Sequence, residues 1–422
     1  MKPSPHASGY ALIAAAVAVA YANAVTASFQ FDDWDVIVFQ PLVHSIGAWW
    51  GSMPGIRPLL KLSYAANYAI SPGPILFHVE NVAIHAANAC LILALLAKRT
   101  TRAIALTTAL IFALHPAQSE AVTYVTGRSS ELSTLFVLLT LNFSTVNSWL
   151  SPALFACALM VKETAVMAAV PLMRLKRGVS SLLVLAGAAV IAAASPMYMH
   201  LLAVSLQTRG IGANLMTQAH AIVYLMGQLV RFDRLNADPA LPAVHAWSAR
   251  VAGEALLIVA LIALGFTLRK KRPEIGYAIL WFFLWLVPTN SLLPRLDVAN
   301  DRQLYLALAG PAFLVARGLG ALARKRAGVA LTATVMLCAT LATATHVRNR
   351  VYGDEITFWR DVVAKSPWNA RGFNNLGFVL AKSHRNDEAD AALSRALELE
   401  PNYVRAAVNL KLLRSGLLLR KQ

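Results

Sequence analysis

ILFHVENVAIHAANACLILALLA, residues 75–97, is long and apolar enough to cross a lipid bilayer as one helix. A membrane-spanning helix needs roughly 20 predominantly apolar residues. The polar residues of this stretch recur every three or four positions, as His78, Asn81, His85 and Asn88. They therefore share one helix face, which we expect to turn inward against a neighbouring helix or, alternatively, a cavity. The stretch predicts an all-α membrane protein.

The composition of the whole chain supports this prediction. Of its 422 residues, 57% are hydrophobic and only 14% are charged, whereas soluble proteins carry about 25% charged residues. Much of the net charge of +17 lies in short basic clusters between apolar runs, a pattern that orients membrane proteins. We therefore expect no nucleic-acid partner. The cysteines Cys90, Cys157 and Cys338 lie inside apolar runs and indicate neither disulfides nor a metal site.

The apolar runs predict about 11 transmembrane helices. They cover residues 8–29, 75–97, 103–114, 131–148, 150–161, 164–174, 179–204, 250–268, 275–292, 304–322 and 327–346. Basic clusters mark the cytoplasmic side of a membrane protein. Here they are Lys98 to Arg102, Arg174 to Arg177, Arg269 to Arg272 and Arg324 to Arg326. A cytoplasmic N-terminus followed by 11 helices places all four clusters on that side.

Two segments between the helices are predicted to lie on the outer side. The loop 30–74 contains an acidic motif and is expected to form interfacial helices. The segment 205–249 includes an apolar stretch, 218–230, which would move every later basic cluster to the wrong side if it crossed the membrane. We therefore predict that it forms a re-entrant or interfacial helix. Together with the helices, these segments make up a membrane domain over residues 1–346.

From about residue 347 the composition becomes that of a soluble helical domain. Pro367 and Pro401 lie 34 residues apart, and apolar or small residues between them mark two antiparallel helices. This period and pattern are typical of the tetratricopeptide repeat. Residues 347–422 are therefore predicted to hold about two such repeats, docked on the membrane domain.

The acidic motif Phe31-Asp32-Asp33-Trp34-Asp35 follows the first apolar run. Acidic groups where a helix leaves the bilayer are costly unless they have a use. A carboxylate in this position can take the proton from an acceptor hydroxyl while a second substrate stays anchored in lipid. Asp32 and Asp33 are therefore the candidate catalytic bases, and the sequence does not choose between them. The alternative is a hydrated helix end without catalytic function.

Several motifs, taken in chain order, resemble those of the transmembrane and tetratricopeptide repeat-containing O-mannosyltransferases, a family with the GT-C fold. They are FDDWD (31–35), GIRPLLKLSYAANY (55–68), FHVENVAIHAANA (77–89), LHPAQSEAVTYVTGRSSELSTLF (114–136), VKETAV (161–166) and VPTNSLLPRLDVANDRQLYLALAG (287–310). The resemblance implies a GT-C membrane domain in which Asp32 or Asp33 is the general base. It also implies a polyprenyl-phosphate-linked sugar as the donor, whose single displacement would invert the anomeric carbon.

The same motifs supply candidates for binding the phosphate and sugar of the donor. They are Arg57, Lys61, Glu120, Arg128, Lys162, Arg302 and Tyr305. Arginine suits phosphate because its planar guanidinium binds two oxygens at once. By the resemblance, Arg302 and Tyr305 form an Arg-x-Leu-Tyr element that contacts the donor phosphate or lipid. The structural alternatives are snorkelling of Arg57 to headgroups, ion pairs of Arg302 with neighbouring aspartates, and interhelical pairing of Lys162.

These inferences predict a membrane glycosyltransferase that transfers a sugar to a hydroxyl acceptor, which we expect to be Ser or Thr of a protein. The alternatives are a transferase that modifies a lipid or cell-surface glycan, and a non-catalytic membrane scaffold. We predict a multi-pass protein of the bacterial inner membrane, surrounded by membrane lipids, with its active site and repeats in the periplasm. An endoplasmic reticulum lumen would give the same topology. The repeats are expected to bind the acceptor protein, with Asn374 and Asn375 as candidates.

No cofactor is expected. The sequence contains neither a P-loop nor a dinucleotide-binding glycine motif. It also shows no cluster of metal ligands, although a divalent metal stays an open alternative because some GT-C enzymes use one.

Overall fold

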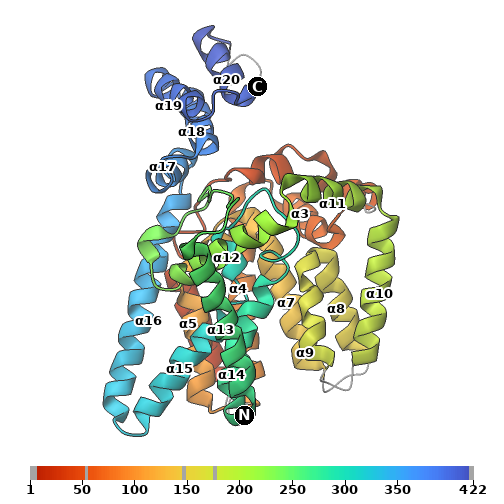
Figure 1. Cartoon of the computed structure of the whole chain (residues 1–422), viewed down its shortest axis with the longest axis vertical. Helices are drawn as coiled ribbons and strands as arrows, with labels where there is room; N and C mark the ends of the chain where they lie inside the picture. Colours follow the sequence, from red (N-terminus) through yellow and green to blue (C-terminus); the bar gives the residue numbers. More distant parts are fainter. Residues whose placement is uncertain (1–6, 53–55, 145–148, 174–177, 418–422) are drawn as a thin grey trace.

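The computed structural model describes residues 7–52, 56–144, 149–173 and 178–417, and these fold almost entirely into helices (Figure 1). The described residues contain no β-strand. The predicted all-α fold is therefore confirmed. The predicted basic cluster from Arg174 to Arg177 lies outside the described residues.

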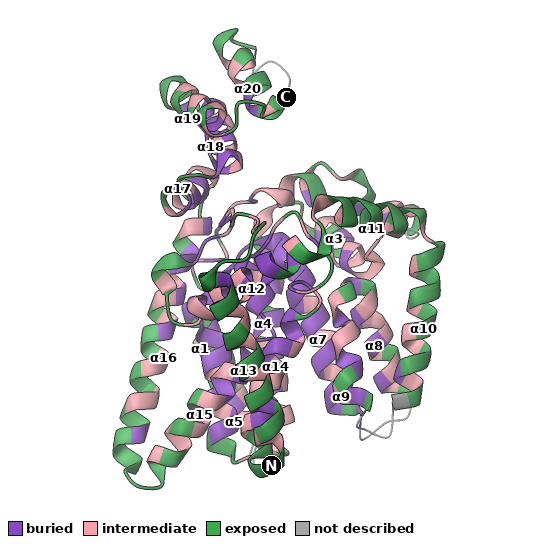
Figure 2. Ribbon diagram, in the orientation of Figure 1, coloured by how far each residue is buried: buried purple, intermediate pink, exposed green. Residues whose placement is uncertain are grey.

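A central bundle contains most of the buried residues (Figure 2). Its helices are α1 (Ala7–Ala20), α4 (Pro74–Ala97), α5 (Arg102–Leu114), α7 (Arg128–Phe143), α14 (Pro273–Leu286), α15 (Ala309–Ala323) and α16 (Ala327–Asn349). The polar face of α4 is buried inside this bundle. The side-chain amide of Asn81 donates to the carbonyl of Val122, and that of Asn88 donates to the carbonyl of Glu131. The inward, helix-packing orientation predicted for these residues is confirmed.

Within the described ranges, three helices are long and apolar enough to cross a membrane: Pro74–Ala97, Ala249–Lys271 (α13) and Ala327–Tyr352. The other apolar helices are shorter, with 10–17 residues, as in Ala7–Ala20 and Ala309–Ala323. The apolar character of the described helices agrees with a membrane protein. These helix lengths do not establish that the protein has 11 transmembrane helices.

The segment 179–204, predicted as one span, is not one continuous helix but is broken at Ser195. Helix α10 (Gly178–Ala194) ends before Ser195, and α11 (Pro196–Thr208) leaves at 83° to it. Proline disfavours helical geometry in the residue before it, and Ser195 accordingly adopts an extended conformation with φ −91° and ψ 114°. In Figure 1, α11 lies across the end of the molecule while α10 runs along it.

The neighbouring prediction of a helix over 164–174 also differs from the structure. After α8 (Leu150–Val161), the chain forms a 3-10 helix, Glu163–Ala168, and then the short helix α9 (Ala169–Met173). Lys162, which separates α8 from the 3-10 helix, is extended, with φ −157° and ψ 130°. The break at Lys162 therefore puts a charged side chain at the end of α8.

Helix α12 (Ile211–Gln228) lies within the segment 205–249 and contacts other loops at both of its ends. The side-chain amide of Asn214 donates to the carbonyl of Ser291 at 2.7 Å. Just beyond the other end, the carbonyl of Leu229 lies 3.1 Å from Nε2 of His115. Ser291 and His115 follow the C-terminal ends of α14 and α5, so α12 spans one end of the bundle.

Four further helices extend from that same end (Figure 1). They are α17 (Glu355–Lys365), α18 (Ala370–Lys382), α19 (Asn386–Leu399) and α20 (Val404–Arg414). Helices α18 and α19 approach closely at Gly377, where an added Cβ would lie 2.6 Å from Cγ of Leu393. Only glycine fits this contact.

Candidate functional site

Asp33 lies directly before a short π-helix, Trp34–Val38, in the motif 31–35, here called the acidic turn, and is fully buried. Its Oδ2 accepts a hydrogen bond from the backbone N–H of Gln30 at 2.9 Å, and its Oδ1 accepts one from the backbone N–H of Thr126 at 2.8 Å. Burial raises the pKa of Asp33 to about 7, although these hydrogen bonds oppose the rise. Because both oxygens are engaged, Asp33 ties the acidic turn to the 3-10 helix Val125–Gly127.

Asp32 differs from Asp33 because it is only partly buried. Its backbone N–H donates to the hydroxyl of Tyr124 at 2.9 Å. Burial raises the pKa of its carboxyl group, while the charge of Arg302 and the hydroxyl of Tyr124 lower it. Of the two candidate bases, Asp32 is therefore the one that is partly exposed to solvent.

Arg302 also contacts Tyr124, at its ring. Its guanidinium carbon is 5.8 Å from the centre of the Tyr124 ring. Glu120 holds Arg302 through two contacts: Oε2 accepts from the backbone N–H at 3.0 Å, and Oε1 lies 3.5 Å from Nε. The carboxylate of Glu120 thus positions Arg302, and the motifs 31–35, 114–136 and 287–310 meet at one place.

A cleft opens beside Arg302. Its lining comprises Ser130, Ser133, Thr134, Val137, Lys162, Thr164, Trp285, Thr289, Arg295, Asn300, Arg302, Gln303, Tyr305 and Leu306. Three of these residues are cationic, Lys162, Arg295 and Arg302, and none is a carboxylate. Apolar side chains from α7 and α14 line another part of the same cleft. This combination suits a ligand with an anionic head and an apolar body.

Lys162 points to Ser130, whose Oγ accepts a hydrogen bond from Nζ at 2.8 Å. Burial lowers the pKa of Lys162, and the nearby charges of Arg57 and Arg302 lower it further. A bound phosphate would favour the protonated amine and raise this pKa again. The hydrogen bond of Lys162 goes to a hydroxyl and not to a carboxylate, so its amine can bind an anion in the cleft.

Arg57 and Lys61 lie outside the cleft lining. Arg57 precedes α3 (Pro58–Ile70) and forms a two-pronged ion pair with Glu163, with Nη2 to Oε1 at 2.6 Å and Nε to Oε2 at 3.0 Å. Burial alone would raise the pKa of Glu163, but Arg57 lowers it to about 2. Lys61 lies one helical turn further on. Arg57 borders the site through Glu163, which is adjacent to Lys162.

Arg128 is fully buried and contacts only other parts of the protein. Its donors reach Oδ1 of Asn81 at 2.7 Å, Oδ1 of Asn67 at 2.5 Å and the carbonyl of Phe77 at 2.9 Å. Nη1 also lies 3.2 Å from the carboxylate of Glu80. Arg128 thus joins α3, α4 and α7, and it does not line the cleft.

Tyr305 does line the cleft, but its hydroxyl turns into the bundle. The hydroxyl lies 2.8 Å from Nδ1 of His85 and accepts from the amide of Asn88 at 3.0 Å. The ring, not the hydroxyl, is thus the part that faces a ligand. Asn374 and Asn375 lie away from this cleft on α18, where the amide of Asn374 donates to Oδ1 of Asn375 and Asn409 donates to Asn374.

Sequence reasoning assigned no function to Tyr124 or Arg295. Tyr124 lies in the motif 114–136 and Arg295 in the motif 287–310, so both belonged to segments already selected. Their contacts depend on how these loops fold together, which a pattern of residue types does not reveal. Among the described residues, no three His, Cys, Asp or Glu side chains come together as a metal site requires.

Comparison with known proteins identifies relatives of this chain. Protein O-mannosyl-transferase TMTC3 of Mus musculus is 32% identical over 143 residues, which cover 30% of this chain and 16% of the relative. Protein O-mannosyl-transferase TMTC1 of Homo sapiens is 31% identical over 195 residues, covering 37% of this chain and 22% of the relative. Protein O-mannosyl-transferase Tmtc1 of Drosophila melanogaster is 32% identical over 187 residues, with 38% and 22% covered.

The resemblance predicted from the motifs is therefore confirmed, since the matching curated relatives are protein O-mannosyl-transferases. The chain spans 16–22% of the length of these three relatives. No family model matches the chain. No solved structure matches it either.

Proposed function

We propose that this relative of the protein O-mannosyl-transferases transfers a mannosyl group from a polyprenyl-phosphate donor to a Ser or Thr hydroxyl of an acceptor protein. The names of the relatives support the sugar and the protein acceptor. The cleft supports the lipid-linked phosphate. The fold we propose for the membrane domain, residues 1–346, is of the GT-C type.

The observation that carries the proposal is the charge of the cleft. Lys162, Arg295 and Arg302 face it, and its lining has no carboxylate to neutralise them. Glu120, which lies outside the lining, pairs with Arg302, but gathering three basic side chains in a partly buried site still costs free energy that a bound anion would offset. A phosphate ester provides that anion, and its polyprenyl chain fits the apolar side chains Val137, Trp285 and Leu306.

Asp32 is the proposed general base. Its carboxylate takes the proton of the acceptor hydroxyl as the oxygen forms a bond to the anomeric carbon. The bond from that carbon to the phosphate oxygen breaks, and the phosphate keeps the electron pair. Lys162, Arg295 and Arg302 stabilise the charge that develops there. Attack opposite the leaving phosphate inverts the anomeric centre.

Asp33, Tyr124 and Glu120 position these groups without touching substrate. Asp33 fixes the turn that carries Asp32. Tyr124 contacts both Asp32 and Arg302, and Glu120 fixes Arg302. Arg57 supports Lys162 indirectly through Glu163. Arg128 keeps α3, α4 and α7 together.

The proposed topology has 11 spans, in the bacterial inner membrane, with this site at the periplasmic face. Its support is the separation of charges. The loops with Lys98 to Arg102, Arg269 to Arg272 and Arg324 to Arg326 lie at the end of the bundle opposite the acidic turn (Figure 1). Basic loops favour the cytoplasmic side. Helices α17 to α20 are then periplasmic tetratricopeptide helices, and α18 with Asn375 is a surface for the acceptor protein.

The test is reconstitution of the full chain in lipid vesicles with polyprenyl-phosphate mannose and a Ser/Thr-rich protein from the same organism. We expect mass spectrometry to find mannose on Ser or Thr of the acceptor with the native chain, and none with D32N. The proposal is wrong if D32N transfers as well as the native chain. Transfer only to lipid or to free glycan would instead establish the alternative acceptor class.

A further inference from the structure

We infer that Arg371 on α18 is a positioning residue of the transfer site, and that it acts through Asp297 on the loop that carries Arg295 and Arg302. The inference rests on the proposed function, because it concerns the cations assigned to the donor phosphate. It gives the C-terminal helices a second function beyond acceptor binding. They hold the catalytic loops in place.

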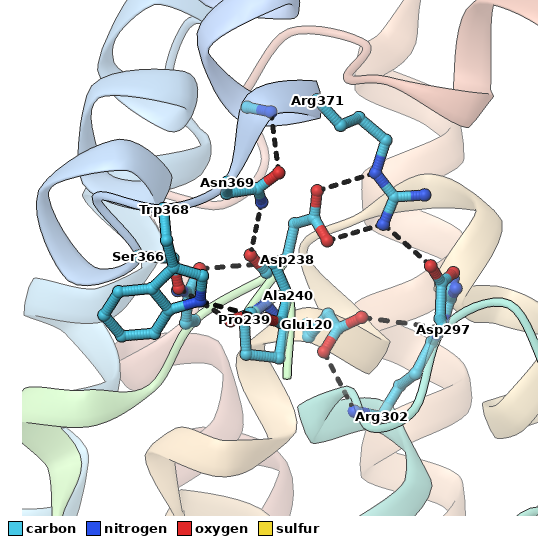
Figure 3. Close-up of polar contacts among 12 residues, drawn as sticks. Glu120, Asp238, Pro239, Ala240, Asp297, Arg302, Ser366, Trp368, Asn369 and Arg371 are labelled. Carbon is cyan, nitrogen blue, oxygen red and sulfur yellow. Dashed lines mark hydrogen bonds and ion pairs between the residues drawn. The ribbon is translucent and has the colours of Figure 1, made fainter. Parts of the chain in front are cut away.

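Arg371 connects two loops of the membrane domain (Figure 3). Its Nη2 lies 2.6 Å from Oδ1 of Asp238 and 2.7 Å from Oδ1 of Asp297, and its Nε donates to Oδ2 of Asp238 at 2.9 Å. Such a two-pronged contact fixes orientation as well as charge. One side chain of α18 therefore holds segments near residues 238 and 297 together.

A second connection runs through the segment 235–240. It is held by the turn between α17 and α18: Oγ of Ser366 donates to the carbonyl of Pro239 at 2.8 Å, and the amide of Asn369 donates to the carbonyl of Asp238 at 2.9 Å. On the other side of the segment, the backbone N–H of Asn236 donates to Oδ2 of Asp301 at 3.1 Å. Asp301 immediately precedes Arg302. Both connections thus end on the loop 295–302.

The same helices also hold the acidic turn. The rings of Phe31 and Trp359 meet edge to face with centroids 5.1 Å apart. Nε1 of Trp34 donates to Glu355 at 2.9 Å, and Nζ of Lys382 lies 4.7 Å from the centre of the Trp34 ring. The general base and the phosphate-binding cations are therefore both fixed against α17 and α18. Their relative placement depends on these helices.

Correct placement of reacting groups has a large effect on rate, since a displacement of about 1 Å can cost about 10²-fold. Loss of Arg371 would leave Asp297, which is near Arg295 and Arg302, without its ion-pair partner. Asp297 would then be free to pair with one of these cations in place of the donor phosphate. The KM for the donor should rise more than kcat falls.

The test compares the native chain with R371Q, R371K, D297N and the double variant R371Q/D297N, all full length in vesicles. R371Q should raise the KM for polyprenyl-phosphate mannose about tenfold or more, and R371K should recover part of the loss. The double variant should lose less than the product of the two single losses, because both act through one contact. R395Q, which breaks an exposed pair with Glu398 on α19, is the matched control.

Amide hydrogen exchange gives a readout that does not require transfer. R371Q should increase exchange in residues 293–304 and leave residues 74–97 unchanged. The inference would be overturned if R371Q left amide exchange in residues 293–304 unchanged. It would also be overturned if the loss of transfer activity in R371Q/D297N equalled the product of the losses in the two single variants. If the native chain transfers no sugar, the proposed function fails, while the exchange difference still decides whether Arg371 holds the loop. If R371Q does not fold, R371K carries the same comparison.

Discussion

The backbone N–H of Asp32 donates to the hydroxyl of Tyr124 at 2.9 Å, and the ring of the same tyrosine lies beside the guanidinium of Arg302. One side chain thus sets the spacing between the acid of the FDDWD motif and a cation of the cleft. Tyr124 thus connects the proposed general base to the proposed site of the leaving phosphate.

The two adjacent aspartates should respond differently to amidation. D32N should reduce transfer by about 10²–10⁴-fold, the usual contribution of a general base, without loss of donor affinity. D33N places an amide N–H against a backbone donor and should lower the free energy of unfolding by about 1–3 kcal/mol. Single-turnover transfer and thermal unfolding of both variants measure the contrast. If D32N and D33N lost transfer rate equally and were equally stable, the assignment of Asp32 as the base and Asp33 as a positioning residue would be contradicted.

Tyr124 should affect catalysis more than donor binding. Y124F keeps the ring that packs beside Arg302 but removes the hydroxyl that accepts from the N–H of Asp32. We expect kcat to fall about tenfold, as expected when a catalytic group loses its orientation, with little change in the KM for the donor. Steady-state kinetics at varied donor concentration separate the two parameters. A rise in KM alone would place Tyr124 on the donor instead.

The pH dependence of transfer should report the pKa of Asp32 and the effect of Arg302 on it. Burial raises the pKa of Asp32, and a base must be deprotonated to act, so kcat should increase as pH rises through this raised pKa. Arg302 lowers that pKa, and R302Q should therefore move the acidic limb to higher pH. The measurement is kcat against pH for both proteins. If the acidic limb of the kcat profile of R302Q stays at the native pH, or moves to lower pH, Arg302 does not lower the pKa of the base.

Much of this arrangement could be predicted from the sequence. The parts that could not be predicted were missed for physical reasons. Apolar runs and inward polar spacing predicted the helices and the buried face of α4, because both depend on local periodicity. The bend at Ser195 was missed because the length of the apolar run outweighed the signal of Pro196. Arg128 matched a motif as well as Arg302 did, yet it is buried among Asn67, Asn81 and Phe77. Only three-dimensional contacts distinguish a cation with protein partners from one that faces a cleft.

Lys162 should make donor binding pH-dependent. Burial and the nearby arginines lower its pKa, so its amine loses its charge as pH rises through that value, and donor affinity should fall with it. K162Q should weaken donor binding by about 10- to 100-fold, equivalent to about 1.5–3 kcal/mol for a charged hydrogen bond. It should also abolish this part of the pH dependence. Binding of polyprenyl phosphate across pH, with the exposed variant R395Q as the control, tests both effects.

Arg128 should be a residue of stability rather than of donor recognition. R128Q leaves the oxygens of Asn67, Asn81 and Phe77 without their charged donor inside the bundle. Breaking such a buried charge contact costs about 3–5 kcal/mol, so the variant should unfold at a markedly lower temperature. The exposed R395Q should not change the unfolding temperature. Donor KM, measured below the unfolding transition, should stay close to the native value for R128Q, because Arg128 does not line the cleft. A stable R128Q with weakened donor binding would instead place this guanidinium on the donor.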